Sequence, residues 1–318
     1  MSSEYHIPVM LDEALEGLAL RPDGTFVDVT FGGGGHARAI LDRLGEGGRL
    51  LAFDQDEDAK VESGKLKVGN GAQFAFINEN FRYLKSFLRL HGVRQVNGIL
   101  ADLGVSSHQF DVAERGFSTR FDGALDLRMD RRGGVTAADL VNSISEEDLS
   151  RLLKLYGELP NARQMAKAIV KSRGLKAIET TTDLKEAVAH HLPRGMENKY
   201  LAMLFQALRI EVNGELDALK EMLQQASEVL VPGGHLVVIS YHSLEDRLVK
   251  NFMRSGNFEG EVEKDFYGNV LSPMRMVSRG AVQASDEELA RNNRARSARL
   301  RVGEKVEAAA PKAMPQDR

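Results

Sequence analysis

Four consecutive glycines, Gly32 to Gly35, are the feature that most constrains the fold of this chain. The residues before them, Thr25-Phe-Val-Asp-Val-Thr, are rich in β-branched and aromatic types, which is typical of a strand. The residues after them, His36-Ala-Arg-Ala-Ile-Leu, have the pattern of a helix start. A strand that leads through a glycine loop into a helix predicts a cradle for a nucleotide cofactor. A glycine turn that only lets a helix pack closely is the alternative, but four glycines cost more backbone entropy than packing requires.

Strand and helix patterns alternate through the first hundred residues. We predict strands at residues 26–30, 49–54, 73–77 and 96–100, and helices at residues 36–44, 55–66 and 80–91, the last with Asn80 as its N-cap. Strands separated by helices indicate βαβ units and a parallel sheet whose two faces are covered by helices. The predicted fold class is therefore α/β, with a doubly wound sheet of the Rossmann-like kind.

The alternation stops after Asp102. Residues 110–210 show helix periodicity without a convincing strand, with helices predicted at 146–155, 161–172 and 182–191. A long amphipathic helix at 213–230, a Pro232-Gly-Gly turn, a strand at 235–241, a helix at 243–253 and two closing strands at 275–278 and 298–302 follow. We therefore predict a discontinuous cofactor domain, residues 1–109 and 211–303, interrupted by an all-helical insert at 110–210. Residues 304–318 have little to bury and are predicted to be a disordered tail.

Composition narrows the function classes. The absence of cysteine excludes disulfides, thiolate zinc sites and cysteine nucleophiles, and it fits a reducing cytoplasm. We see no signal-peptide pattern and no apolar run near the ~20 residues of a membrane span, so we expect a cytoplasmic protein without a membrane partner. The net charge of −4 means that any surface for nucleic acid must be a local patch.

The glycine loop alone does not identify the cofactor. The spacing Gly32-x-Gly34-x-x-Ala37 also fits the dinucleotide fingerprint, with Asp54 about 20 residues after it, so a nicotinamide oxidoreductase is one alternative. Two features favour S-adenosyl-L-methionine. One is the Pro232-Gly-Gly turn before a strand, which is common in class I methyltransferases, and the other is an acid after each of three predicted strands.

These three acids are Asp28, Asp54 and Asp102. Asp54 can accept both ribose hydroxyls, and Asp28 or Asp102 can lie near the cationic sulfonium and amino groups. A pyrophosphate would be repelled by the same acids. The backbone N–H groups of Gly33, Gly34 and Gly35 can approach the cofactor because no Cβ intervenes.

Over nearly its whole length the chain resembles a specific family, the bacterial 16S ribosomal RNA cytosine-N4 methyltransferases (the MraW or RsmH family). The resemblance is carried by motifs that occur in order, among them Thr30-Phe-Gly-Gly-Gly-Gly-His, Asp102-Leu-Gly-Val-Ser-Ser-His-Gln, Glu114-Arg-Gly-Phe-Ser, Phe205-Gln-Ala-Leu-Arg-Ile-Glu-Val-Asn, Ser240-Tyr-His-Ser-Leu-Glu-Asp-Arg and Arg294-Ala-Arg-Ser-Ala. It implies a class I methyltransferase that acts on a cytidine in the decoding region of the small ribosomal subunit. It also implies cofactor contacts from Gly34, Gly35, His36, Asp54, Phe81, Asp102 and Gln109.

Asp102 is the candidate acceptor for a hydrogen of the cytosine amine, because it ends the fourth strand. A role only as cofactor ligand is an equal alternative.

His242 is a catalytic candidate, although a strand-end histidine with satisfied hydrogen bonds is a slightly better explanation. His36 is better explained as a loop organiser or cofactor contact than as a base. Ser106, Ser107 and His242 could hydrogen-bond the base, and Phe110, Phe117 or Tyr241 could stack on it.

Candidate RNA contacts come from basic residues. Arg163, Lys167 and Lys171 recur at i, i+4 and i+8 and therefore share one helix face. A second group is Arg291, Arg294, Arg296, Arg299 and Arg301, and a third lies in glycine-bearing loops of the insert: Arg115, Arg120, Arg128, Arg131 and Arg132. As phosphate contacts they would position RNA without reading its sequence, and an ordinary solvated face is the alternative.

Other expectations concern metals, partners and competing functions. His190-His191 has no carboxylate or thiolate at ligand spacing, so we expect no metal site. The partner that we expect is 16S rRNA within the small subunit, and the sequence is compatible with a homodimer. A methyltransferase acting on protein or a small molecule, a nicotinamide oxidoreductase and a binding module that uses the cofactor structurally are the competing functions.

Overall fold

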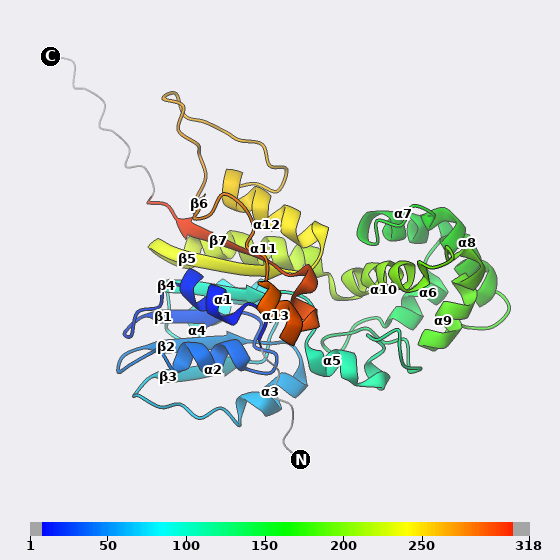
Figure 1. Ribbon diagram of the computed structural model, residues 1–318, viewed down its shortest axis with the longest axis horizontal. Coiled ribbons are helices and arrows are strands. Elements are labelled where there is room, and N and C mark those ends of the chain that lie inside the picture. Colours follow the sequence, from blue (N-terminus) through cyan, green and yellow to red (C-terminus); the bar gives the residue numbers. More distant parts are fainter. Residues whose placement is uncertain (1–7, 308–318) are drawn as a thin grey trace.

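The computed structural model describes residues 8–307 and shows one seven-stranded sheet with a helical insert beside it (Figure 1). The strand order is β3-β2-β1-β4-β5-β7-β6. Strands β1 to β5 are parallel neighbours, while β7 is antiparallel to both β5 and β6. The strands are β1 (Thr25–Asp28), β2 (Arg49–Phe53), β3 (Gln73–Ile77), β4 (Val96–Asp102), β5 (Leu230–Ser240), β6 (Met274–Met276) and β7 (Arg299–Lys305).

Helices cover both faces of the sheet. Alternating strand residues divide between the two faces, so that Val27 and Ile99 pack against helices α4, α11 and α12, whereas Phe26 and Leu100 pack against α1 and α2. The helices of this part are α1 (Leu11–Gly17), α2 (Gly35–Leu41), α3 (Glu57–Ser63), α4 (Leu84–Leu90), α11 (Glu215–Val229), α12 (Ser243–Ser255) and α13 (Asp286–Arg291). The predicted fold class, a doubly wound α/β sheet with an all-helical insert, is confirmed.

The insert has a hydrophobic core of its own. Its buried residues fall between Phe117 and Leu208, and none of them belongs to the two clusters that flank the sheet. Val105 and Val212, just outside the predicted insert at 110–210, also pack against this core, and the exact boundaries stay a prediction. The insert helices are α6 (Ala137–Ser143), α7 (Glu146–Tyr156), α8 (Ala162–Arg173), α9 (Thr181–Val188) and α10 (Glu197–Asn213), and the short α5 (Ser107–Asp111) leads into them.

Several boundaries differ from the sequence prediction. The Pro232-Gly-Gly segment is a bulge inside β5, because Val96 pairs with Leu230 but Gly98 pairs with His235, and Gly233 takes a φ of 76°. The helix predicted at 80–91 starts as the 3-10 turn η1 (Phe81–Tyr83), capped by Asn80 as predicted. Strand β7 continues to Lys305, past the predicted start of the tail, and residues 308–318 lie outside the described part.

Helix α10 is the main element that the sequence analysis did not delimit. It joins α11 through Gly214, whose φ of 57° ends one helix and starts the next. Within residues 8–307, no helix has both the length and the apolar character that a bilayer crossing requires.

Candidate active site

The three acids predicted to face the cofactor meet at the carboxyl edge of the sheet. Asp28 ends β1 and Asp102 ends the neighbouring strand β4, while Asp54 directly follows β2. Tyr241 follows β5 on the other side of β4. The strand order changes direction between β1 and β4, which is the point where ligands bind in open α/β sheets.

Asp102 lies at the centre of a buried cluster. Its Oδ1 accepts a hydrogen bond of 2.7 Å from the hydroxyl of Tyr241, and its Oδ2 is 3.7 Å from Nδ1 of His36. Burial raises the pKa of Asp102 to about 7, although the Tyr241 hydrogen bond acts in the opposite direction. At neutral pH this carboxyl group is therefore close to its titration point.

Asp28 and His36 complete the cluster. Asp28 is 1% exposed and its Oδ1 accepts the backbone N–H of Thr30, but its Oδ2 has no hydrogen-bond partner. Burial raises the pKa of Asp28 to about 6 and lowers that of His36. Nε2 of His36 is 3.1 Å from the carbonyl oxygen of Val9, so this histidine fastens the N-terminal segment to the loop. This contact is what a loop organiser makes, and the cofactor contact of His36 stays a prediction.

The glycine loop serves packing and cofactor access at different residues. A Cβ on Gly34, which has a φ of 75°, would lie 2.7 Å from the Phe31 ring, and a Cβ on Gly35 would lie 2.5 Å from Pro8. Gly33 has no neighbour within 4 Å of its Cβ position and borders open space. Gly33 thus leaves room for a ligand beside the loop, while close packing explains why Gly34 and Gly35 lack side chains.

Asp54 is held in a fixed orientation by backbone amides. Its Oδ2 accepts the N–H of Gly32 at 2.8 Å, and its Oδ1 accepts the N–H of Asp56 at 2.9 Å. Burial raises its pKa to about 6. Each oxygen keeps a free lone pair for a hydroxyl. Phe81, the predicted aromatic contact, starts η1 and packs half-buried against the core.

Gln109 and Ser106 form the start of α5. The Ser106 hydroxyl accepts the N–H of Gln109, and the Gln109 side-chain oxygen accepts the N–H of Ser106, a reciprocal capping box. Nε2 of Gln109 donates to Asp56 at 2.7 Å. The buried Gln109 amide thus fixes α5 to the segment after Asp54, and its contact with the cofactor stays a prediction. Ser107 is the first residue of α5.

Arg115 does not lie on an RNA-binding surface, contrary to our expectation. It is 2% exposed and pairs with Asp56 at 2.8 Å and Asp58 at 3.1 Å. It also donates to the carbonyl oxygens of Arg128 and Met129. A guanidinium group with this many buried acceptors fastens the insert to the sheet domain.

Arg128 is the second insert arginine proposed to bind RNA. Its guanidinium group also donates several hydrogen bonds to acceptors within the chain. Its Nε donates to Asp126 at 2.7 Å and its Nη1 to the Gly133 carbonyl. These contacts order the loop before α6.

The three aromatic residues proposed to stack on the base differ in their exposure and surroundings. Phe117 is buried in the insert core beneath the Arg115 guanidinium, so it cannot stack on a base. Phe110 is 38% exposed. The ring of Tyr241 lies 3.4 Å from the Cβ position of Gly104, which has a φ of 101°. A side chain on Gly104 would disturb the ring that holds Asp102.

His242 caps α12. Its Nδ1 accepts the N–H of Glu245, and the Glu245 carboxylate accepts the N–H groups of both Tyr241 and His242. Although burial acts against it, contact with His242 holds the pKa of Glu245 below its usual range. The Nδ1 atom of His242 therefore has the hydrogen-bond partner that we expected for a satisfied strand-end histidine. Its Nε2 is buried without a hydrogen-bond partner, 3.1 Å from Glu245 Oε1.

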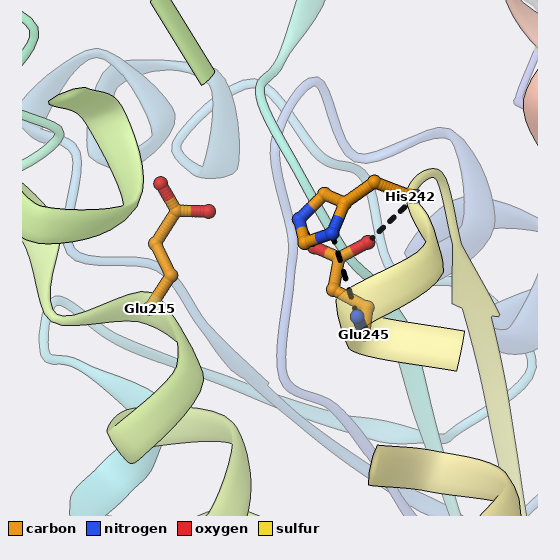
Figure 2. A group of neighbouring side chains, drawn as sticks. All are labelled: Glu215, His242 and Glu245. Atoms are coloured by element: carbon orange, nitrogen blue, oxygen red, sulfur yellow. Dashed lines mark hydrogen bonds and ion pairs between the residues drawn. The ribbon is translucent and has the colours of Figure 1, made fainter. Parts of the chain in front are cut away.

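The same histidine belongs to a group that has the composition of a metal site. Figure 2 shows Glu215, at the start of α11, facing His242 and Glu245, and their ligand atoms lie within 4.8 Å of one another. Both carboxylate oxygens of Glu215, however, accept hydrogen bonds from Arg209, at 2.8 and 2.9 Å. The Arg209 guanidinium thus occupies the position of the counter-cation, and we assign the group as an ion-pair network.

The basic face on α8 is exposed and remote from the sheet edge. Arg163, Lys167 and Lys171 are exposed and have no ion pair with other residues between 8 and 307, whereas Met165, Ala166 and Ile169 face the insert core. In Figure 1, α8 lies at the outer end of the insert. Any RNA that touches it would extend well beyond the reacting nucleotide.

Comparison with known proteins identifies the family. A family model described as the MraW methylase family matches residues 3–306. The chain belongs to the MraW methylase family. It is 57% identical over 301 residues to a Bacteroides thetaiotaomicron protein named ribosomal RNA small subunit methyltransferase H, covering 95% of this chain and 97% of that protein. Proteins of the same name from Parabacteroides distasonis (56%) and Flavobacterium johnsoniae (54%) match 95% of this chain and 98% of their own length.

Among solved structures, an rRNA methylase from Streptococcus thermophilus matches 95% of this chain and 99% of its own at 11% identity and a TM-score of 0.43. We draw no conclusion from so distant a match. Membership of a methylase family decides against the nicotinamide oxidoreductase that the glycine spacing left open.

The sheet edge fits S-adenosylmethionine, the methyl donor of this enzyme class. Asp28 is buried and Asp102 is partly buried, neither has a lysine or arginine partner among the described residues, and Asp28 Oδ2 is unsatisfied. A buried carboxylate without a cation is costly, so a cationic ligand at this edge would be favourable. Asp54 would hold the ribose and Gly33 would border the cofactor.

Sequence reasoning missed two supporting residues. Thr30 accepts the backbone N–H of Asp102 with its hydroxyl at 2.6 Å, which fixes the end of β4 against β1. Arg209 balances the charge of Glu215. Thr30 and Asp102 are 72 positions apart in the sequence, and no local sequence pattern predicts that they are in contact.

Proposed function

We propose that this chain transfers a methyl group from S-adenosylmethionine to the N4 amine of a cytidine in 16S rRNA. The observation that carries the proposal is the 57% identity, over 95% of the chain, to a relative named ribosomal RNA small subunit methyltransferase H. The acidic cluster around Asp102 supports it, because an acceptor at this edge suits an amine as the methyl acceptor.

The chemistry is limited by the nucleophile. The N4 lone pair of cytosine is delocalised into the ring, and the bound cofactor supplies a methyl group that is already strongly electrophilic. The enzyme must therefore mainly hold the amine in line with the methyl group. A hydrogen-bond acceptor about 3 Å from an amine hydrogen favours the pyramidal nitrogen that can attack.

Asp102 is the residue that we assign to this role. Tyr241 occupies Oδ1, so Oδ2 is the oxygen that can accept from the amine, and His36 lies on the same side. His242 follows Tyr241 directly and is a second candidate contact to the base, although its Nε2 lies 3.1 Å from Glu245 Oε1. Ser106, Ser107 and Phe110 remain proposed substrate contacts on α5 and its N-cap.

The substrate that we propose is the small ribosomal subunit, at the decoding region of its RNA, and the cytoplasm is the proposed location. A cytosine must leave its stack to reach Asp102, so the target is single-stranded or flipped out. The exposed residues Arg163, Lys167 and Lys171 would contact phosphates farther along the RNA. Association of two copies as a homodimer remains part of the proposal and is testable by sedimentation.

Methylation of defined substrates tests the proposal. Small subunits from cells that lack this protein are incubated with the enzyme and labelled S-adenosylmethionine, and the modified nucleotide is then mapped in the RNA. We expect label at the N4 position of one cytidine in 16S rRNA. Label in ribosomal proteins or in small molecules, but not in RNA, would overturn the proposal in favour of the protein or metabolite alternatives.

A further inference from the structure

A cavity of about 220 Å³ lies next to the candidate active site. One wall is the segment after β5, which contributes Tyr241, His242 and Ser243. The opposite wall is the segment that enters β7, from Arg296 to Arg299, with Gln283 beside it. The two walls meet because β5 and β7 are antiparallel neighbours, with Ser240 paired to Arg299.

The lining of this cavity suits an anion. It carries two guanidinium groups, the hydroxyl of Ser297 and a glutamine amide, while the Ser243 hydroxyl donates to Glu158, and no lining residue is an acid. Arg296 is exposed and has no hydrogen bond or ion pair with any residue that the structure describes. Planar guanidinium groups together with hydroxyls are the usual ligands of phosphate oxygens.

Nearby acids do not cancel this charge. Asp246 lies behind the wall, where buried Arg301 binds both of its oxygens and Arg299 contacts it at 3.2 Å. Glu158 of the insert reaches the rim, where it accepts the Ser243 hydroxyl at 2.5 Å. Glu245, behind the opposite wall, is bound by the N–H groups of Tyr241 and His242. Arg296 is thus the cation of the lining that has no acidic partner among the described residues.

The cavity is separated from Asp102, the proposed amine acceptor, only by the side chain of Tyr241. Tyr241 lines it, and the hydroxyl of the same residue binds Asp102. A nucleotide with its base at Asp102 would therefore have its sugar-phosphate backbone within reach of this cavity. The motif Arg294-Ala-Arg-Ser-Ala, which the proposed mechanism does not use, supplies the donors.

We propose that this cavity binds a phosphodiester group of the substrate RNA adjacent to the target cytidine, with Arg296 as its main ligand. The inference rests on the proposed function, because it assumes an RNA substrate. It assigns Arg296 a positioning role: the residue holds the backbone so that the unstacked base meets Asp102. Such a contact contributes affinity for RNA without contributing affinity for the cofactor.

The test compares Arg296→Ala with Arg21→Ala. Arg21 is also exposed and without a side-chain partner among the described residues, but it precedes β1 and so lies at the opposite edge of the sheet. Methylation of unmodified small subunits is measured at saturating S-adenosylmethionine over a series of salt concentrations. For Arg296→Ala we expect KM for subunits to rise about 10-fold. The slope of log KM against log salt concentration should become smaller by about one, which corresponds to the loss of one phosphate contact. Arg21→Ala should match the wild type.

Two further measurements separate the explanations. Arg296→Lys keeps the charge but loses the planar fork, so KM should lie between those of the wild type and Arg296→Ala. Cofactor affinity, measured by calorimetry, should be unchanged in all variants. An unchanged KM in Arg296→Ala, or an equal loss of cofactor affinity, would overturn the inference. Failure of the wild type to methylate subunits would instead overturn the proposed function.

Discussion

The hydroxyl of Tyr241 donates a 2.7 Å hydrogen bond to Oδ1 of Asp102 and thereby joins the ends of two adjacent strands, β5 and β4. This bond stabilises the ionised carboxylate and opposes the effect of burial, which raises the Asp102 pKa to about 7. The amine acceptor that we propose must be ionised. The protonation of Asp102 is therefore set by the balance of these two effects.

Replacing Tyr241 with Phe should move the pH dependence of catalysis. Without the hydrogen bond, the pKa of Asp102 rises further, so a smaller fraction of the enzyme is ionised at pH 7. We expect the acidic limb of the kcat/KM profile to shift to higher pH and the rate at pH 7 to fall several-fold, with convergence toward wild type at pH 9. Tyr83→Phe, at an exposed position, is the control. An unshifted limb would show that Tyr241 does not control this titration.

Asp102→Asn tests the acceptor directly. The amide oxygen is a weaker acceptor than a carboxylate, so we expect kcat to fall about 100-fold. Calorimetric titration with S-adenosylmethionine measures cofactor affinity separately, and we expect the loss of affinity to be much smaller than the loss of kcat. Turnover near the wild-type value with intact cofactor binding would remove Asp102 from the acceptor role and leave it as a cofactor ligand only.

Asp28→Asn should stabilise the cofactor-free protein at alkaline pH. The folded-state pKa of Asp28 is about 6, above its ordinary value of 3.8, so its contribution to stability is greatest below about pH 4 and is lost as the pH rises through 6. Since this shift corresponds to about 3 kcal/mol, the variant should melt at a higher temperature than wild type at pH 8. At pH 4 the two proteins should melt alike.

The same variant should bind S-adenosylmethionine more weakly, because an acid facing the cationic groups is lost. A higher melting temperature together with weaker binding would identify Asp28 as a residue kept for the ligand at the cost of stability. Equal melting temperatures at pH 8 would contradict the assigned pKa.

Arg115→Ala should destabilise the fold rather than impair RNA binding specifically. It would leave the carboxylate of Asp56 buried and unpaired, and breaking a buried pair in this way costs about 3–5 kcal/mol. We expect a large fall in the denaturant midpoint. Arg120→Ala, in the exposed part of the same loop region, should leave the midpoint unchanged. A stable Arg115→Ala protein with weak RNA binding would restore our original expectation.

The α8 face is tested by charge reversal. Lys167→Glu combined with Lys171→Glu should weaken binding to small subunits about 10-fold or more while sparing cofactor affinity. The control is Lys60→Glu combined with Lys67→Glu, which changes net charge equally at exposed positions of the sheet domain. Binding is measured by filter retention of labelled subunits. Equal losses in both double variants would point to net charge alone, and unchanged binding would identify the α8 face as an ordinary solvated surface.

Local patterns were sufficient to predict that the seven strands exist, although not all of their bounds. The strand at 73–77 was predicted with its observed bounds, and the acids at 28, 54 and 102 fall at the carboxyl edge because parallel strands end at the same side. These features depend on residue type and on neighbours along the chain. The Asn80 cap was predictable for the same reason.

Pairings across long sequence distances were not predictable. Arg115 looked like a phosphate ligand because its charge is visible in the sequence, whereas its partners Asp56 and Asp58 become neighbours only after folding. Phe117 looked like a stacking residue until the insert core enclosed it. The contact of Gly35 with Pro8, which leaves no room for a side chain, was likewise not visible in the sequence.

The burial of Arg115 has a consequence for how a substrate enters. Its guanidinium group bridges acids of the sheet domain and carbonyl groups of the insert. A hinge opening between the two parts would therefore leave several buried charged groups exposed or without their partners. We therefore expect the two parts to move as a single rigid unit on the timescale of turnover. The mobility needed for catalysis must then come from the RNA, and the enzyme should favour cytidines that leave their stacks easily.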